Sequence, residues 1–306
     1  MRKVLVTGAS GFIGRHCLPL LASRGYEVHA LARHRLEHSD FPEVHWHEVD
    51  LLTPGSCALL LSSLQPEFLL HLAWYAVPGK FWEATENFEW VRASLELLLA
   101  FAKNGGTRVV VAGTCAEYDW SDGECKEGTT PLLPSTLYGT SKHALERLVN
   151  AWNHQRIVSS AWGRVFFLYG PDENPSRLVA YVVRSLLQNR LALCSDGHQL
   201  RDFLHVEDVA SAFVSLLESQ VVGPVNIGSG KPIAVRDVLN EIGQHMGHPE
   251  LLAFGARSSV DEPAAIWANI ERLTKEILWV PRYDLEHGLE QTIEWWRKSP
   301  NAGLPT

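Results

Sequence analysis

The sequence predicts an α/β protein built on a Rossmann-type, doubly wound parallel sheet, with a smaller C-terminal lobe. Short runs rich in β-branched residues alternate with longer helical patterns along the first half of the chain. A glycine-rich turn, Gly8 to Gly14, lies between the first predicted strand and the first predicted helix. The run Val109-Val110-Val111-Ala112 is apolar throughout, as in a parallel strand buried on both faces.

In chain order, the strands of the first half are predicted at residues 3–7, 27–31, 44–48, 68–72, 108–112 and 159–167. The helices between them are predicted at residues 13–24, 56–64, 90–103 and 138–153. Gly25 lies just beyond the first helix, where a C-terminal glycine is typical. This alternation predicts a parallel sheet with helices on both faces.

The pattern changes after Gly170-Pro171, where helices are predicted at residues 177–188, 206–218, 237–246 and 285–296. Turn-rich segments join them. We therefore divide the chain into a main domain, residues 1–170, and residues 171–306, which mainly form a smaller lobe completing a substrate cleft. A strand is predicted at 224–227, and it could pair with the main sheet. Part of the segment near 203–230 is therefore assigned to either the smaller lobe or the main domain.

Composition excludes several classes of protein. The chain has 306 residues, of which 46% are hydrophobic and 20% are charged, as in ordinary globular proteins with a large core. Its net charge of −8 disfavours a nucleic-acid-binding protein. Apolar runs are too short for a membrane span, which needs about eighteen residues or more. The five cysteines match neither a zinc site nor a disulfide scaffold, so we expect no metal and a cytoplasmic location.

The glycine-rich turn predicts a dinucleotide site. Glycines permit a tight turn and let a pyrophosphate approach the backbone, while the following helix offers N–H groups and a partial positive charge. Glycines at this spacing indicate a dinucleotide site only when a strand precedes them and a helix follows, as is predicted here. The main domain is therefore predicted to be dinucleotide-binding through Gly8, Gly11, Phe12, Ile13 and Gly14.

The end of the second strand bears on the choice of cofactor. An acidic residue there binds the adenosine ribose of NAD, whereas an arginine accommodates the 2′-phosphate of NADP. This chain has Arg33 and Arg35 and no acid at that place. We therefore predict NADP, through charge-assisted bonds from these arginines, with NAD as the alternative if both are solvated surface residues.

Tyr138-Gly139-Thr140-Ser141-Lys142 places a phenol and an ammonium one helical turn apart on one face. A free tyrosine has a pKa of about 10, and a nearby ammonium and an oxidised nicotinamide both favour its phenolate. Tyr138 then exchanges a proton with a carbonyl oxygen as hydride moves. Thr114, at the end of the fifth strand, supplies a hydroxyl that holds the reacting oxygen. Thr114, Tyr138 and Lys142 are the predicted catalytic residues.

The turn Thr7-Gly8-x-x-Gly11-Phe12-Ile13-Gly14 and the Tyr-x-x-x-Lys pair resemble the extended short-chain dehydrogenases/reductases. Other segments, spread over nearly the whole chain, resemble the NAD-dependent epimerase/dehydratase family, whose members mostly act on nucleotide-linked sugars. These segments are His71-Leu72-Ala73, Tyr169-Gly170-Pro171, Arg201-Asp202-Phe203-Leu204-His205-Val206 and Asn226-Ile227-Gly228.

The resemblance implies further roles. Asp50 and Leu51 would edge the adenine, Leu72 and Ala73 would line the cofactor cleft, and Arg201 would bind the nucleotide diphosphate, which suits a guanidinium fork. Arg177 is a second candidate for the phosphates, and its alternative is a solvated helix residue. The resemblance also implies a homodimer formed through the helices at 90–103 and 138–153.

Departures from the family pattern narrow the reaction. Cys115 and Ala116 stand where sugar-nucleotide 4,6-dehydratases carry an Asp-Glu pair, which disfavours dehydration. Phe167 occupies the place of an asparagine that contacts the substrate phosphate in many members. We predict reduction of a nucleotide-linked 4-keto-6-deoxyhexose at C4. The alternatives are a sugar-nucleotide 4-epimerase with retained NAD, a reductase of small carbonyl compounds and a non-catalytic dinucleotide sensor.

Overall fold

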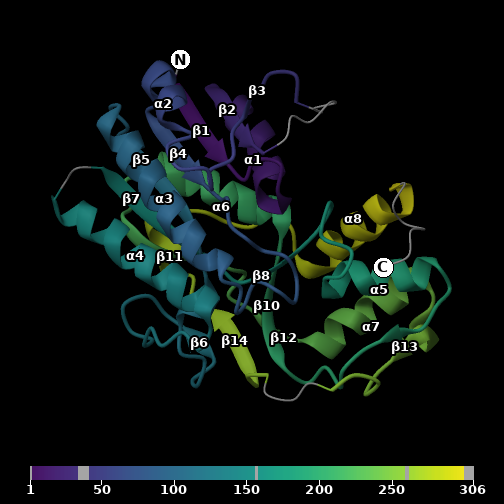
Figure 1. The fold of residues 1–306 in the computed structure, drawn as a ribbon. Coiled ribbons are helices and arrows are strands. Elements are labelled where there is room, and N and C mark those ends of the chain that lie inside the picture. Colours follow the sequence, from purple (N-terminus) through teal and green to yellow (C-terminus); the bar gives the residue numbers. More distant parts are fainter. Residues whose placement is uncertain (1, 34–40, 156–157, 259–261, 300–306) are drawn as a thin grey trace.

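The computed structural model describes residues 2–33, 41–155, 158–258 and 262–299 (Figure 1). Its largest unit is a seven-stranded sheet in which every neighbouring pair of strands is parallel. The strands lie in the order β11 (Gly223–Ile227), β7 (Ser159–Val165), β5 (Arg108–Thr114), β4 (Phe68–His71), β1 (Arg2–Thr7), β2 (Tyr26–Ala32) and β3 (His45–Glu48). The chain winds outward in both directions from β1, so the predicted doubly wound α/β fold is confirmed.

Helices cover both faces of this sheet because its strands are apolar on both sides. They are α1 (Phe12–Ser23), α2 (Ala58–Leu64), α3 (Glu86–Lys103), α4 (Leu137–Gln155) and α6 (Val206–Glu218). Val4 and Val6 of β1 pack in the core under α1 and α6, whereas Leu5 packs in the core under α2, α3 and α4. In Figure 1, α3 and α4 lie next to each other on one face.

The remainder of the fold contains a second sheet and three further helices. The second sheet contains β6 (Glu124–Cys125), β8 (Phe167–Tyr169), β10 (Leu200–His205), β12 (Pro232–Ala234) and β14 (Ala265–Ala268). The smaller lobe is built from α5 (Leu178–Leu187), α7 (Val235–Met246), α8 (Leu285–Lys298) and the strand pair β9 (Ala192–Leu193) and β13 (Leu252–Ala253). Short helical turns are η1 (Cys115–Glu117), η2 (Pro249–Leu251) and η3 (Arg272–Glu276).

Two predicted elements differ from the structure. The strand expected at 159–167 is divided, because β7 ends at Val165 and the chain crosses to the second sheet, where β8 pairs with β10. The N–H of Phe166, between them, donates to the carbonyl of Ile227 at 3.1 Å. The helix expected at 90–103 begins earlier, at Glu86, where two glutamates in its first turn favour the positive helix end. The strand expected at 224–227 is present as β11 beside β7.

The smaller lobe is tied to the first helix of the main domain. Arg15 of α1 forms an ion pair with Asp172, and His16 Nε2 lies 3.1 Å from the carbonyl oxygen of Pro171. Within the described ranges, no helix has both the length and the apolar character required to cross a bilayer.

Candidate active site

The glycine turn lies where β1 and β4 end side by side, the point at which the winding of the sheet changes direction. Gly8 has φ +67°, and a Cβ there would lie 2.7 Å from the backbone N of Ala73. A Cβ on Gly14 would lie 2.1 Å from the carbonyl oxygen of Gly8. Both positions therefore require glycine, because only a bare backbone permits this close approach.

The first turn of α1 is left open to an anion. Gly11 caps it without a side chain, and its first turn carries no acidic residue. Phe12 and Ile13, both half-buried, follow directly. The unsatisfied N–H groups of this turn and the helix dipole favour a negatively charged group. The predicted residues therefore fit the pyrophosphate of a nicotinamide dinucleotide.

Leu72 and Ala73 lie beside the glycine turn, next to a buried row of hydrogen-bonded polar side chains. The N–H of Leu72 donates to the carbonyl of Thr7 at 3.1 Å, and the Thr7 hydroxyl lies 2.6 Å from His71 Nδ1. His71 Nε2 lies 2.9 Å from the Ser94 hydroxyl on α3. Burial lowers the pKa of His71 to about 3, with a smaller contribution from Lys142. His71 is thus neutral at physiological pH and joins β1, β4 and α3.

The predicted adenine end is more open. Arg33 is exposed in the bend after β2, and Arg35 lies outside the described residues. Asp50 follows β3 at the surface, and its Oδ1 accepts from the N–H of Leu52 at 3.0 Å. Leu51 is buried in the core beneath α2. The structure thus places Arg33 and Asp50 after adjacent strands, with one Asp50 oxygen engaged in a local turn.

The three predicted catalytic residues come together at the carboxyl end of β5. Thr114 is its last residue, and Tyr138 and Lys142 follow from the first turns of α4. The side chains of Thr114 and Tyr138 share a hydrogen bond. Lys142 is buried, and its Nζ donates to the carbonyl of Ala112 on the same strand at 2.7 Å. A phenol, an ammonium and a hydroxyl thus share one small site.

Burial dominates the electrostatics of this site. It raises the pKa of Tyr138, while the hydrogen bond from Thr114 and the charge of Arg177 act in the opposite direction. It lowers the pKa of Lys142 to about 7, against the attraction of Glu117. Because desolvation disfavours every charged form, the phenolate needs additional positive charge near its oxygen before it can act as a base.

The Lys142 pKa predicts a measurable dependence of stability on pH. Burial lowers it from 10.5 to about 7, so between these values the unfolded chain binds a proton that the folded chain does not. The stability of the wild type, compared with Lys142→Met, should therefore rise with pH across this window, by up to about 1.4 kcal/mol per pH unit. Urea unfolding of both proteins at a series of pH values tests this. Parallel stability curves would contradict it.

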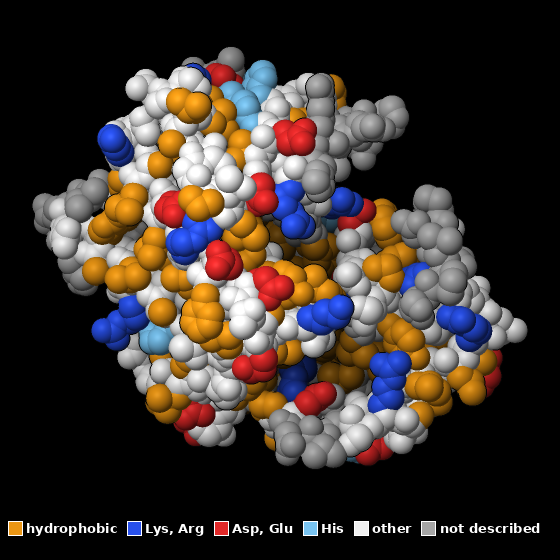
Figure 2. All heavy atoms as spheres, in the orientation of Figure 1, with side chains coloured by type: hydrophobic (Ala, Val, Ile, Leu, Met, Phe, Trp, Pro, Cys, Tyr) orange, Lys and Arg blue, Asp and Glu red, His pale blue; other side chains and the backbone are white. Residues whose placement is uncertain are grey.

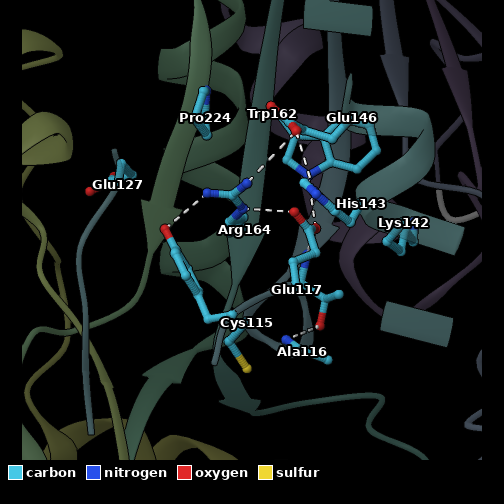
Figure 3. Close-up of polar contacts among 12 residues, drawn as sticks. Cys115, Ala116, Glu117, Glu127, Lys142, His143, Glu146, Trp162, Arg164 and Pro224 are labelled. Atoms are coloured by element: carbon cyan, nitrogen blue, oxygen red, sulfur yellow. Dashed lines mark hydrogen bonds and ion pairs between the residues drawn. The ribbon is translucent and has the colours of Figure 1, made fainter. Parts of the chain in front are cut away.

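A buried carboxylate lies directly behind Thr114 (Figure 3). Glu117, in η1, has no exposed surface, and its Oε1 accepts from the N–H of Thr114 at 2.8 Å and from Trp162 Nε1 at 2.9 Å. Its Oε2 accepts from Arg164 Nε at 2.7 Å. Two strands and the turn that follows β5 are thereby joined, which fixes the backbone that carries the Thr114 hydroxyl.

Arg164 extends this network to neighbouring elements. Burial opposes its charge, but Glu117 and Tyr118 outweigh that effect and raise the pKa of Arg164. Its Nη1 donates to the Tyr118 hydroxyl at 3.0 Å, which donates to Asn226 on β11 at 2.8 Å. Glu146 on α4 lies 4.0 Å from Arg164 Nη2 (Figure 3). The helix that carries Tyr138 and Lys142 is thus in contact with the same network.

The predicted substrate residues lie at two places. Arg177 is exposed at the start of α5, with its guanidinium 5.7 Å from the ring centre of Phe81 and its charge felt by Tyr138. Phe167 is half-buried in β8, 5.4 Å from the Arg201 guanidinium. Figure 2 shows a hollow with a largely hydrophobic lining between the main domain and the lobe of α5, α7 and α8.

Arg201 is held by the protein itself. It is 5% exposed, and its Nη1 donates to the carbonyls of Leu200 and Pro263 at 2.8 and 2.9 Å. Its Nη2 lies 3.3 Å from Glu262, whose side chain is half exposed. A diphosphate bound here would therefore compete with the Glu262 carboxylate for this guanidinium.

Two residues of the site were missed by the sequence reasoning. Glu117 lies three positions after Thr114, a spacing typical of a capping box, which the structure contains. Trp74 follows the Leu72-Ala73 segment and lies over Lys142. Among the described residues, no group of three or more His, Cys, Asp or Glu side chains is placed to hold a metal ion.

Comparison with known proteins gives the family. A sequence model of the NAD dependent epimerase/dehydratase family matches residues 4–228, and the chain belongs to this family. MoeE5, solved with UDP-glucuronic acid and NAD, is 31% identical with a TM-score of 0.83, over 97% of this chain and 99% of MoeE5. TunA, a NAD-dependent NDP-hexosamine 5,6-dehydratase of tunicamycin biosynthesis, is 29% identical with a TM-score of 0.84, over 98% of this chain and 99% of TunA.

A relative of similar length comes from Bacillus subtilis. YtcB, described as an uncharacterised UDP-glucose epimerase, is 28% identical over 96% of this chain and 97% of its own. The protein is thus an enzyme of the extended short-chain dehydrogenase/reductase type. The similarity to MoeE5, TunA and YtcB covers both the main domain and the smaller lobe.

Proposed function

We propose that this enzyme is a sugar-nucleotide 4-epimerase that retains NAD and acts at C4 of a nucleotide-linked hexose. The observation that carries the proposal is the group of buried Thr114 and Lys142 with half-buried Tyr138 at the carboxyl end of β5. Cys115 and Ala116, in place of an Asp-Glu pair, argue against loss of water as the main reaction. The name of YtcB supports the epimerase over the reductase that we predicted from the sequence.

The protein's side chains divide the chemistry at C4 between them. Bound nicotinamide supplies a hydride acceptor and donor. Tyr138 takes the proton of the C4 hydroxyl as the C4 hydride leaves with its electron pair, and a C4 carbonyl forms. Thr114 donates a hydrogen bond to the reacting oxygen, and Lys142 favours the phenolate by its charge. For epimerisation the sugar then presents its other face, and Tyr138 returns the proton to the C4 oxygen as hydride returns to C4.

We place the substrate between the main domain and residues 171–306, with Arg177 and Arg201 toward its phosphates and Phe167 beside them. Gly8, Gly11 and Gly14 receive the cofactor pyrophosphate, and Leu72 and Ala73 line its cleft. MoeE5 was solved with NAD, and TunA is described as NAD-dependent, which supports NAD here. The five buried cysteines are all unpaired, which supports a reducing compartment such as the cytoplasm.

A second candidate is the 4-ketoreductase that uses NADPH. Its support is Arg33, exposed directly after β2 where an acidic residue would bind the ribose of NAD. A reductase draws on a reduced cofactor pool, whereas an epimerase recycles its own cofactor. The two candidates share Thr114, Tyr138 and Lys142 and differ in whether reduced cofactor is consumed.

One experiment separates them. The purified enzyme is incubated with UDP-glucose, UDP-glucuronic acid and 4-keto-6-deoxy sugar nucleotides, with NAD, NADH or NADPH, and both absorbance and products are followed. Interconversion of C4 epimers without net cofactor change supports the epimerase. Stoichiometric oxidation of NADPH indicates the reductase, and a product lighter by one water indicates a dehydratase. Turnover of simple ketones alone would overturn the sugar-nucleotide assignment.

We also propose a homodimer through α3 and α4. Phe88 and Leu99 on α3 are 61% and 59% exposed, and Leu148 on α4 is 51% exposed. Phe88 and Leu99 are eleven residues apart, about three helical turns, and so lie on one face. A second copy of the same helix pair would cover these side chains and build a four-helix interface.

Introducing charge on this face should separate the subunits. Leu99→Glu with Leu148→Glu is expected to shift the molar mass in light scattering from dimer to monomer, because burying two carboxylates per chain opposes association. Val280→Glu is the matched control, since Val280 is 76% exposed and follows Trp279, whose indole donates to Ser211 on α6, a different helix. A wild type that is already monomeric, or a double variant that remains dimeric, would exclude this interface.

A further inference from the structure

The loop between β4 and α3, residues 72–85, is aromatic and lies over the catalytic helix. Its Trp74 ring centre is 3.8 Å from Nζ of Lys142, within the range of a cation–π contact. Lys142 is 3% exposed, and its other polar contact is the hydrogen bond to the carbonyl of Ala112. Little water reaches this ammonium, so the negative face of the indole is a substantial part of what stabilises its charge.

The indole is held in place independently of Lys142. Its Nε1 donates to Asn87 Oδ1 at 2.9 Å, and Asn87 is fully buried. Asn87 Nδ2 in turn donates to the carbonyls of Phe81 and Ala84, both at 2.8 Å. The Trp90 ring stacks on Trp74 with centres 6.2 Å apart. The ring face is therefore presented to the ammonium by the loop itself, as a preorganised site requires.

The same loop also encloses Tyr138. Phe81 and Trp82 meet the Tyr138 ring edge to face at centre distances of 4.8 and 5.9 Å. The N–H of Tyr138 donates to the carbonyl of Trp82 at 2.9 Å. One loop, fastened by Asn87, thus contacts both members of the Tyr-x-x-x-Lys pair.

We propose that Trp74 is a positioning residue of the active site, whose indole face holds the Lys142 ammonium in its charged form beside Tyr138. The proposal rests on the catalytic role proposed above for Lys142. It assigns the aromatic loop a part in the chemistry in addition to packing.

The charges around Lys142 explain why such a contact matters. Glu117, from η1, raises its pKa, whereas burial lowers it to about 7. His71, from β4, is neutral at physiological pH, since its own pKa is about 3. Tyr138, on the same helix, is uncharged until it loses its proton. With the Lys142 pKa this close to neutral pH, a change of one unit alters the charged fraction several-fold.

The test is a graded series, Trp74→Phe and Trp74→Leu, measured as kcat against pH. Both variants lose the bond to Asn87, but only phenylalanine keeps an aromatic face, and a weaker one. Because the ammonium is lost as pH rises, the basic limb of the profile should move to lower pH. We expect this limb to move by about one pH unit in Trp74→Leu, equivalent to about 1.4 kcal/mol, and by less in Trp74→Phe. The KM for the sugar nucleotide should change less than about twofold, because uniform binding is untouched.

Tyr75→Leu is the matched control, because Tyr75 is the next residue of the loop and packs into the core under α3. It should leave the pH profile unchanged. If Tyr75→Leu moved the basic limb of the kcat profile as far as Trp74→Leu, loop packing would be responsible and the proposal would be overturned. The same conclusion would follow if Trp74→Phe and Trp74→Leu moved it equally.

A second readout needs no turnover. A double-mutant cycle of Trp74→Leu and Lys142→Met on unfolding should give a coupling at about pH 5.5 that disappears at about pH 9, because only the ammonium attracts the indole. Coupling without epimerase activity would retain the Trp74 proposal and reject the proposed function. A coupling independent of pH would reject the Trp74 proposal alone.

Discussion

Replacing Tyr138 with phenylalanine is expected to lower kcat by about 10²- to 10⁴-fold, the usual effect of removing a general acid or base. The hydroxyl that bonds to Thr114 is lost, whereas the contacts of the ring with Phe81 and Trp82 remain. The fold and the sugar-nucleotide KM should therefore change little. Steady-state kinetics and thermal unfolding of the same preparation measure both effects.

Tyr26→Phe provides the control for this change. The Tyr26 ring is buried at the start of β2, and its hydroxyl has no hydrogen-bond partner among the described residues. Its removal should leave kcat unchanged and stability equal or slightly higher, because a buried unpaired hydroxyl is unfavourable. If Tyr138→Phe kept kcat within about tenfold of the wild type, Tyr138 would not be the proton-transfer group.

Local patterns were enough to predict much of the site. The Gly8 turn follows β1, Thr114 ends β5, and Tyr138 and Lys142 lie in the first turns of the helix that precedes β7. A parallel sheet brings the carboxyl ends of its strands to one edge. The positions of these residues relative to the predicted strands therefore indicated that they lie close together in the fold. The same logic failed at Phe166, where the chain leaves one sheet for another within a single apolar run.

Other parts of the site depend on pairings between distant segments. Glu117 is indistinguishable by type from a surface glutamate, and it becomes a buried partner only when β7 aligns with β5 so that Arg164 lies opposite Gly113. Trp74 is one of eleven tryptophans, and its place over Lys142 requires the fold of the whole β4–α3 loop. Register and loop conformation are set by tertiary packing, which single-sequence patterns do not contain.

The largest expected loss of stability comes from Arg164→Met. Arg164 is 1% exposed, and its removal leaves the Glu117 carboxylate buried without its countercharge. Breaking one side of such a buried pair costs about 3–5 kcal/mol of unfolding free energy. Urea denaturation, with the midpoint and slope fitted separately, measures the loss. Arg297→Met is the control, since its contact with Glu294 at 3.7 Å is about half exposed and is worth at most about 1 kcal/mol.

A second substitution, in Glu117, tests whether the stability lost in Arg164→Met comes from the unpaired carboxylate. Glu117→Gln keeps an oxygen for the N–H groups of Thr114 and Trp162 but removes the charge. In the double variant neither charge of the Arg164–Glu117 pair remains, so the loss of stability should be well below the sum of the single losses. Simple addition of the two losses would mean that Arg164 acts mainly through its packing and its bond to Tyr118. Because the Glu117 charge also raises the pKa of Lys142, the double variant should recover stability more fully than kcat.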